Sequence, residues 1–121
     1  MSGPELGYPL RGEIWWAQFS TDPPGKLRPA IIVSQNARNA HPRAGSVLTI
    51  PLSTSIYKLR PDQMLLTAGE TGMKEDSVAW TGNISALGKS QLRNPVEGHR
   101  PLTNTRICAL AELVQMAMGC G

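Results

Sequence analysis

Apolar segments of four to seven residues alternate with turn-forming residues over the first 90 positions of the chain. They are rich in β-branched and aromatic residues and are bounded by Gly, Pro, Asn and Ser, which is typical of strands. The continuous apolar run at 29–34 is suited to a strand buried on both faces. The pattern predicts strands at 13–19, 29–34, 47–52, 63–67 and 77–80, with 83–87 extending the last one beyond a bend at Gly82.

A different period appears near the C-terminus. Between Thr103 and Met118 apolar residues recur every three or four positions, which places them on one helix face. This face consists of Ile107, Leu110, Ala111, Val114, Ala117 and Met118. Thr103 is suited to cap the helix, and Gly119 is suited to the position after its last turn. We therefore expect a mainly β or α+β fold, a small curled antiparallel barrel with a C-terminal helix.

The remaining segments show neither period. Residues 1–10 contain glycines and prolines and are interpreted as a flexible leader to a single domain at 11–121. Residues 20–26 form a turn with two prolines and a glycine, residues 35–45 form a polar excursion, and residues 88–101 are expected to be irregular.

Composition narrows the possible partners only slightly. A chain of 121 residues is long enough for one domain with a modest core. Its formal net charge of +3 and its pI near 9.2 permit an anionic partner without requiring one. Eight arginines stand against four lysines, and the arginine fork matches phosphate oxygens better.

The two cysteines, Cys108 and Cys120, give neither a disulfide framework nor a metal-ligand spacing, which fits a reducing cytosol. Cys108 falls on the apolar side of the expected helix and is interpreted as a packing residue. The N-terminus lacks the pattern of a signal peptide, and no apolar run approaches the roughly 18 residues of a membrane span. We expect a cytoplasmic protein that does not enter a membrane.

Several kinds of catalytic site are disfavoured. His41 and His99 are far apart and lack neighbouring ligands at metal-binding spacing, so no metal site is expected. The chain contains no Gly-x-Ser-x-Gly elbow and no phosphate-binding Gly-x-x-x-x-Gly-Lys loop.

Polar residues stand at the ends of two predicted strands. Arg28 enters the strand at 29–34, and the hydroxyl residues Ser53, Thr54 and Ser55 follow the strand at 47–52. If these strands are neighbours, a guanidinium and several hydroxyls meet at one sheet edge and could hold a phosphate. Taken separately, the two features are equally consistent with an exposed arginine and a polar turn.

Other residues near these ends are suited to a single-stranded polyanion. Lys26 adds charge beside Arg28, and Tyr57 lies between the hydroxyl residues and the cations Lys58 and Arg60. An exposed tryptophan could stack on a base, although the residue types favour a core or dimer-interface tryptophan. The chain has Trp15, Trp16 and Trp80.

The order of these segments resembles the MazF/PemK family of toxin endoribonucleases. The resemblance rests on Arg-Gly-Glu-Ile-Trp at 11–15, Arg-Pro-Ala-Ile-Ile-Val-Ser at 28–34 and Ile-Pro-Leu-Ser-Thr-Ser at 50–55. It continues through Asp-Ser-Val at 76–78 and Lys-Ser-Gln-Leu at 89–92, and it covers nearly the whole chain.

This resemblance implies an SH3-like barrel that works as a homodimer. It implies cleavage of single-stranded RNA, chiefly mRNA, without a metal or cofactor, and neutralisation by a cognate antitoxin. In this reaction the ribose 2′-hydroxyl attacks its own phosphate and yields a 2′,3′-cyclic phosphate and a 5′-hydroxyl.

The resemblance also assigns residues. Arg28 matches the catalytic arginine of the family, and Ser53 matches the position usually held by a catalytic threonine. The residues expected to bind RNA are Lys26, Thr54, Ser55, Tyr57, Lys58 and Asn83.

Two departures from the family pattern affect the expected mechanism. The turn at 20–27 is shorter than the loop that closes over RNA in relatives. After the strand at 77–80 many relatives carry an acidic residue, a glutamine and an arginine, where this chain has Gly82, Asn83 and Ser85. Without the carboxylate that some relatives use as a general base, the chain is expected either to rely on Arg28 and Ser53 or to be weak or inactive as a nuclease.

Two other functions stay open at this point. One is a catalytically silent barrel that acts through a protein partner, as the gyrase-poisoning CcdB toxins do with the same fold. The other is a remnant that only sequesters an antitoxin. The RNA motif that would be cut does not follow from residue types.

Overall fold

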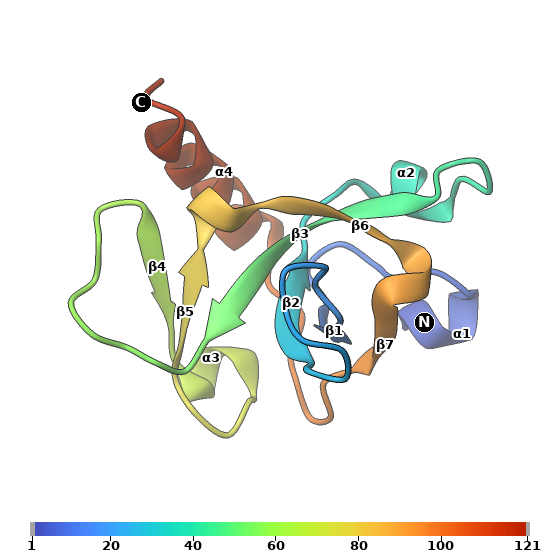
Figure 1. Ribbon diagram of the computed structural model, residues 1–121, viewed down its shortest axis with the longest axis horizontal. Helices are drawn as coiled ribbons and strands as arrows, with labels where there is room; N and C mark the ends of the chain where they lie inside the picture. The colour runs from blue at the N-terminus through green and yellow to red at the C-terminus, as the bar shows by residue number, and fades with distance from the viewer. Residues whose placement is uncertain (1, 121) are drawn as a thin grey trace.

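The computed structural model describes residues 2–120, so Met1 of the expected leader and Gly121 of the expected domain lie outside it. Its seven strands form one antiparallel sheet in the order β4-β5-β3-β2-β1-β7, with β6 also paired to β3 (Figure 1). The strands are β1 (Ile14–Ala17), β2 (Arg28–Ile32), β3 (Ser46–Ser53), β4 (Gln63–Leu66), β5 (Ser77–Trp80), β6 (Ser85–Gly88) and β7 (Leu92–Pro95).

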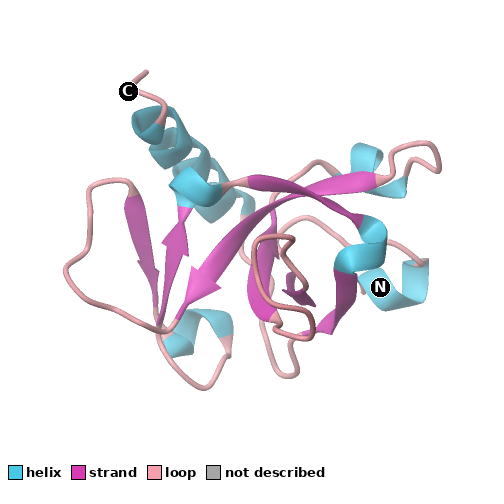
Figure 2. Ribbon diagram, viewed as in Figure 1, coloured by secondary structure: helices cyan, strands magenta, loops and turns pink. Residues whose placement is uncertain are grey.

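Helices are short except for the last one (Figure 2). They are α1 (Gly3–Leu6), α2 (Asn36–Ala40), α3 (Ala68–Thr71) and α4 (Asn104–Ala117), with 3₁₀ turns η1 (Thr81–Asn83) and η2 (Lys89–Gln91). The expected combination of an antiparallel sheet with a C-terminal helix is confirmed. The sheet is not closed within residues 2–120, because the end strands β4 and β7 pair with other strands and not with each other.

β3 is the strand on which the rest of the sheet is assembled. Its first half pairs with β6 and its second half with β5, while β2 pairs along its middle residues (Figure 1). The predicted extension of β5 beyond Gly82 is therefore correct in outline. The chain makes the 3₁₀ turn η1 and then continues along β3 as β6.

The core lies between the sheet and the first half of α4. Ile14, Ile31 and Ile50 from three strands pack with Ile107 and Leu110 of the helix, all of them almost fully buried. The run at 29–34 is buried on both faces as expected, since consecutive residues of β2 are inaccessible.

The predicted helix is correct in its position and its caps. Thr103 accepts a hydrogen bond from the N–H of Arg106, and Gly119 follows the last turn with φ of +85°. The predicted apolar face is only half correct, because α4 runs beyond the sheet and leaves its last turns in solvent. Ala111, Ala117 and Met118 are exposed.

Three further expectations are corrected. Cys108 is exposed and lies 3.8 Å from Nη2 of Arg11, so it does not pack in the core. The polar excursion at 35–45 contains α2, and the segment at 88–101 contains η2 and β7. β7 escapes a pattern-based prediction because its Arg93 and Asn94 are exposed and no alternation of apolar residues marks it.

Residues of the expected flexible leader form α1, which is tied to the sheet by the buried side chain of Glu13. The Glu13 carboxylate accepts hydrogen bonds from the backbone N–H of Gly3 at 3.0 Å and of Leu10 at 2.7 Å. A helix long and apolar enough to cross a membrane does not occur between residues 2 and 120.

Candidate functional site

The strand register brings the two predicted ends together. β2 and β3 pair antiparallel through Ala30 with Pro51 and Ile31 with Ile50. Continued by two residues, the same register sets Arg28 opposite Ser53. On its other side Ser53 pairs with Val78 of β5, which fixes its position in the sheet.

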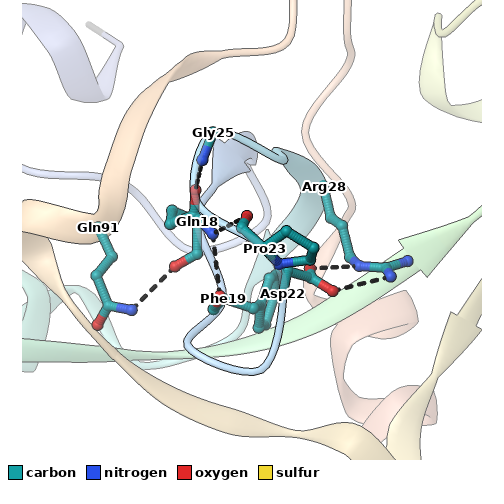
Figure 3. Close-up of polar contacts among 7 residues, drawn as sticks. All are labelled: Gln18, Phe19, Asp22, Pro23, Gly25, Arg28 and Gln91. Atoms are coloured by element: carbon teal, nitrogen blue, oxygen red, sulfur yellow. Dashed lines mark hydrogen bonds and ion pairs between the residues drawn. The ribbon is translucent and has the colours of Figure 1, made fainter.

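Arg28 is held by a carboxylate that the sequence analysis did not single out. Its Nε lies 2.6 Å from Oδ2 of Asp22, and its Nη2 lies 3.0 Å from Oδ1 (Figure 3). The Asp22 side chain is 10% exposed and that of Arg28 is 36% exposed. A guanidinium has five N–H donors in a fork, so the edge formed by Nη1 and Nη2 keeps donors for a second anion.

The ion pair shifts both groups toward their charged forms. Hydrogen bonds from Arg28 lower the pKa of Asp22, against a smaller opposing effect of burial. The same contact raises the pKa of Arg28. Asp22 is therefore a poor proton acceptor at neutral pH, and it is better suited to orienting Arg28 than to taking a proton.

This lowered pKa predicts a pH dependence of stability. Because the unfolded chain binds a proton at Asp22 more readily than the folded chain, the pair stabilises the fold above the unfolded carboxyl pKa of about 3.9. That contribution is lost as the pH falls through the lower folded pKa. In denaturant titrations, the stability difference between the parent and Asp22→Asn is expected to be constant from about pH 8 to 5 and to shrink below about pH 4. A difference that grows on acidification would contradict this.

The turn that carries Asp22 is built around Gln18. The Gln18 amide donates to the carbonyls of Phe19 and Pro23, and its oxygen accepts from the N–H of Gly25 at 2.9 Å (Figure 3). The side-chain amide of Gln91, the last residue of η2, donates to the backbone carbonyl of Gln18 at 2.9 Å. The short turn expected from the sequence is thus a hydrogen-bonded structure that presents Asp22 to Arg28.

Arg28, Ser53 and Asn83 line one cavity of about 450 Å³, which we call the central cavity. Among the described residues that line this cavity, Arg28 is the only cation and Asp22 is the only carboxylate, so the two charges balance. The Ser53 hydroxyl accepts a hydrogen bond from the N–H of Ser55 at 3.1 Å. This bond uses the oxygen and leaves the hydroxyl hydrogen free to donate into the cavity.

A second cavity, of about 590 Å³, continues from the other side of Arg28 and Ser53 and is called the Lys26 cavity. Lys26, Thr54 and Ser55, three of the residues expected to bind RNA, line it. A third, of about 510 Å³, is called the Lys58 cavity and is lined by Tyr57 and Lys58 together with Asn83. Every site residue predicted from the sequence therefore lines at least one of the three cavities.

The three cavities adjoin through shared lining residues, and together they are called the groove. The central and Lys26 cavities share Arg28 and Ser53, whereas the central and Lys58 cavities share Trp80, Gly82 and Asn83. The Lys58 cavity contains two cations, Lys58 and Arg60, against the single carboxylate of Asp62, so its charge is positive where the central cavity is neutral.

A carboxylate from another segment lies beside Gly82, where relatives often carry an acidic side chain. A Cβ built on Gly82 would lie 3.6 Å from Oδ2 of Asp62. The backbone of Asp62 is held by the buried Thr81 hydroxyl, which donates to its carbonyl. Asp62 opens into the Lys58 cavity and lies 3.5 Å from Nε of Arg60.

Asp22 and Gln18 are the site residues that the sequence analysis missed. The signal available for Asp22 was its place six residues before Arg28, across a Pro-Pro-Gly turn that reverses the chain. Nothing in the pattern marks Gln18, whose role depends on the closed turn. Among residues 2–120, no group of three or more His, Cys, Asp or Glu side chains is placed to hold a metal ion.

The fold and this groove define a small antiparallel β-sheet protein with a cation-bearing surface suited to a single-stranded polyanion. The chain belongs to the PemK-like, MazF-like toxins of type II toxin–antitoxin systems, whose family model matches residues 10–116.

Curated relatives are similar over most of their length. The chain is 33% identical to endoribonuclease MazF9 of Mycobacterium tuberculosis over 94 residues, which covers 71% of this chain and 78% of that protein. It is 29% identical to endoribonuclease MazF2 of Mycobacterium bovis over 89 residues, with the same shares of the two chains covered.

Solved structures agree on the fold. The toxin MazF-mt6 of Mycobacterium tuberculosis superposes with a TM-score of 0.71 at 22% identity, covering 90% of this chain and 98% of that one. A mycobacterial endoribonuclease in complex with its cognate antitoxin gives 0.70 at 22% identity, covering 93% and 97%. The MazE–MazF complex of Deinococcus radiodurans gives 0.70 at 18% identity, covering 93% and 98%.

Proposed function

We propose that this chain is a toxin endoribonuclease that cleaves single-stranded RNA, chiefly mRNA, at short motifs. The observation that carries the proposal is the placement of Arg28 opposite Ser53 in one cavity, with donors of the Arg28 fork left for a second anion. The membership of the chain in the MazF-like toxins and its likeness to named endoribonucleases support the reaction class.

In the proposed reaction the ribose 2′-oxygen attacks the adjacent phosphorus, and the bond from phosphorus to the 5′-oxygen breaks. The products are a 2′,3′-cyclic phosphate and a 5′-hydroxyl. Negative charge grows on the non-bridging oxygens as the phosphorane forms. The free edge of Arg28 would donate to these oxygens, and its stabilisation is larger in the transition state than in the ground state.

Ser53 orients the reacting group in this scheme. Its hydroxyl oxygen is held by the N–H of Ser55, which limits the hydroxyl to a few orientations and points its hydrogen toward an RNA oxygen in the central cavity. Asp22 acts through Arg28 as a positioning residue, because both of its oxygens are engaged by the guanidinium. The proton of the 2′-hydroxyl passes to water, and the leaving 5′-oxygen takes a proton from water.

The proposed partners follow from the family and the charges of the groove. RNA would run along the adjoining cavities, with Lys26, Thr54 and Ser55 on one side of the cut and Tyr57, Lys58 and Asn83 on the other. A cognate antitoxin would bind this chain, as similar toxins are found in complex with their antitoxins, and its proposed binding site is this groove. We further propose that the toxin is a homodimer, acts in the cytoplasm and needs neither metal nor cofactor.

The test is incubation of purified protein with a long defined RNA in EDTA. We expect discrete fragments that carry a 2′,3′-cyclic phosphate at one end and a 5′-hydroxyl at the other. Mapping their ends identifies the motif. Intact RNA over varied sequences would reject the nuclease and favour the silent binding module, whose arginine is neutralised by Asp22.

A further inference from the structure

We propose that Trp80 is the stacking platform for an unpaired base next to the cleaved phosphodiester, and that the Lys58 cavity is the subsite for that nucleotide. The inference rests on the proposed RNA cleavage and specifies where the substrate continues beyond Arg28 and Ser53. It assigns a ligand class, an unstacked nucleotide of single-stranded RNA, to a cavity outside the reacting centre.

Trp80 stands where two cavities meet. It lines both the central cavity and the Lys58 cavity, and 39% of it is exposed. The other two tryptophans are unsuited to this role, since Trp15 is buried and Trp16 packs against the core. An exposed indole at a junction between two polar cavities offers the flat face on which a base stacks.

The backbone that carries Trp80 is held on both sides of the indole. Trp80 ends β5, where it pairs with Gln63 of β4, and its neighbours Ala79 and Thr81 are fully buried. The Thr81 hydroxyl donates to the Asp62 carbonyl and fixes the chain directly after the indole. An indole has only two rotatable side-chain bonds, so it loses little conformational entropy on binding, which is the property that favours aromatic anchors.

The backbone after Trp80 leaves room for a nucleotide. A Cβ on Gly82 would meet only the Asp62 carboxylate at 3.6 Å and the Ala117 methyl at 3.9 Å, and the glycine places no side chain at the border that the two cavities share. Asn83, exposed on the same wall, offers both an amide donor and a carbonyl acceptor to a base edge.

The charges of the two cavities also favour the Lys58 cavity as the place where the RNA continues. The central cavity is balanced by the pair of Arg28 with Asp22, whereas the Lys58 cavity has an exposed lysine and Arg60, which is 73% exposed. The 3.5 Å separation between Arg60 and Asp62 is a loose contact that a phosphate can displace. The phosphate next to the stacked base is therefore expected over Lys58 and Arg60.

The test measures binding of a fluorescently labelled 2′-O-methyl oligonucleotide that contains the mapped motif and cannot cyclise. Each nucleotide in turn is replaced by an abasic one. With the parent, one abasic position beside the cut should weaken binding by about tenfold, within the range measured for a single stacked base. In Trp80→Ala this penalty should disappear, because the stacking partner is already absent. In Trp80→Phe most of it should remain.

Leu59→Ala is the matched control, since Leu59 is 44% exposed but does not line any of the three cavities. It should retain the full abasic penalty. A penalty that persists in Trp80→Ala, or that moves to Tyr57→Ala, overturns the assignment. The assignment is also overturned if, without RNA, the indole fluorescence of the parent changes with protein concentration and that of Trp80→Phe does not. Trp80 would then lie in a dimer interface.

The cleavage assay in EDTA is run on the same variants. Trp80→Ala should raise KM for RNA and change kcat little, whereas loss of the reacting centre would lower kcat. If the parent never cleaves, the nuclease proposal fails and no motif can be mapped, and the oligonucleotide that it binds most tightly among varied sequences is used instead. An abasic penalty that disappears in Trp80→Ala would then show that Trp80 remains a stacking site. If the parent cleaves and Trp80→Ala shows the same KM, only the Trp80 assignment fails.

Discussion

Replacing Arg28 with alanine is expected to lower kcat for RNA cleavage by about 10²–10³-fold, the usual effect of removing one donor to a developing oxyanion. Arg28 is the cation that faces Ser53 across the register and lines the central cavity. Its free donors are the groups placed to meet a phosphorane oxygen. Initial rates at saturating RNA, with folding checked by circular dichroism, measure the effect.

Two further variants separate the contribution of Arg28 to the chemical step from the effect of its charge on RNA binding. Arg28→Ala leaves the Asp22 carboxylate without its partner, and that carboxylate could itself repel RNA. The double variant Asp22→Ala/Arg28→Ala removes this repulsion and should still show the low kcat. Arg28→Lys keeps the charge but loses the fork, so an intermediate rate is expected. Parent-like kcat in the double variant would show that Arg28 does not stabilise the transition state.

The arrangement of β2 and β3 could be predicted because both strands have a strong sequence signal. The two apolar runs are long and contain β-branched residues, and the chain between them is polar, so an antiparallel pair is the simplest arrangement. In such a pair the start of the first run meets the end of the second, so the pattern predicts that Arg28 lies near Ser53 if the two strands are neighbours. The structure shows that they are. The same reasoning locates α4 from its period and its caps.

Elements defined by long-range contacts could not be predicted in this way. β7 has no alternating pattern and forms because its backbone pairs with β1, on a sheet edge that exists only after folding. α1 is only four residues long, and Glu13, ten residues beyond Gly3, anchors it. The exposure of the end of α4 could not be predicted either, because its apolar residues continue past the sheet that would cover them.

The same distinction applies to the site. Arg28 and Ser53 lie at the ends of strongly patterned strands, whereas Asp22 reaches Arg28 through a turn whose shape depends on Gln18. Because the two oxygens of Asp22 engage two nitrogens of Arg28, the guanidinium is both oriented and neutralised. Affinity for RNA must then come largely from the flanking cations, with Arg28 contributing mainly to the chemical step.

Glu13→Ala is expected to lower the free energy of unfolding by about 3 kcal/mol, because it removes a buried charged acceptor of several hydrogen bonds. Glu13 is 4% exposed and accepts from the N–H groups of Gly3 and Leu10 and from the Trp15 indole at 3.2 Å. For a domain of this size the loss corresponds to roughly 10–14 °C in Tm. Urea titration and thermal melting measure it.

Two milder variants test whether Glu13 acts by anchoring α1. Glu13→Gln keeps an oxygen for Leu10 and Trp15 but turns an amide donor toward the Gly3 N–H, so about 1 kcal/mol and the docking of α1 should be lost. Gly3→Ala should release α1 as well, because its Cβ would collide with Oε1 of Glu13 and lie 2.8 Å from the Tyr8 carbonyl. In both, amide exchange should accelerate at Leu6 and Tyr8, whose N–H groups bond within this segment. Unchanged exchange there, together with a stability loss in Glu13→Ala, would place the contribution of Glu13 on Trp15 and the sheet instead.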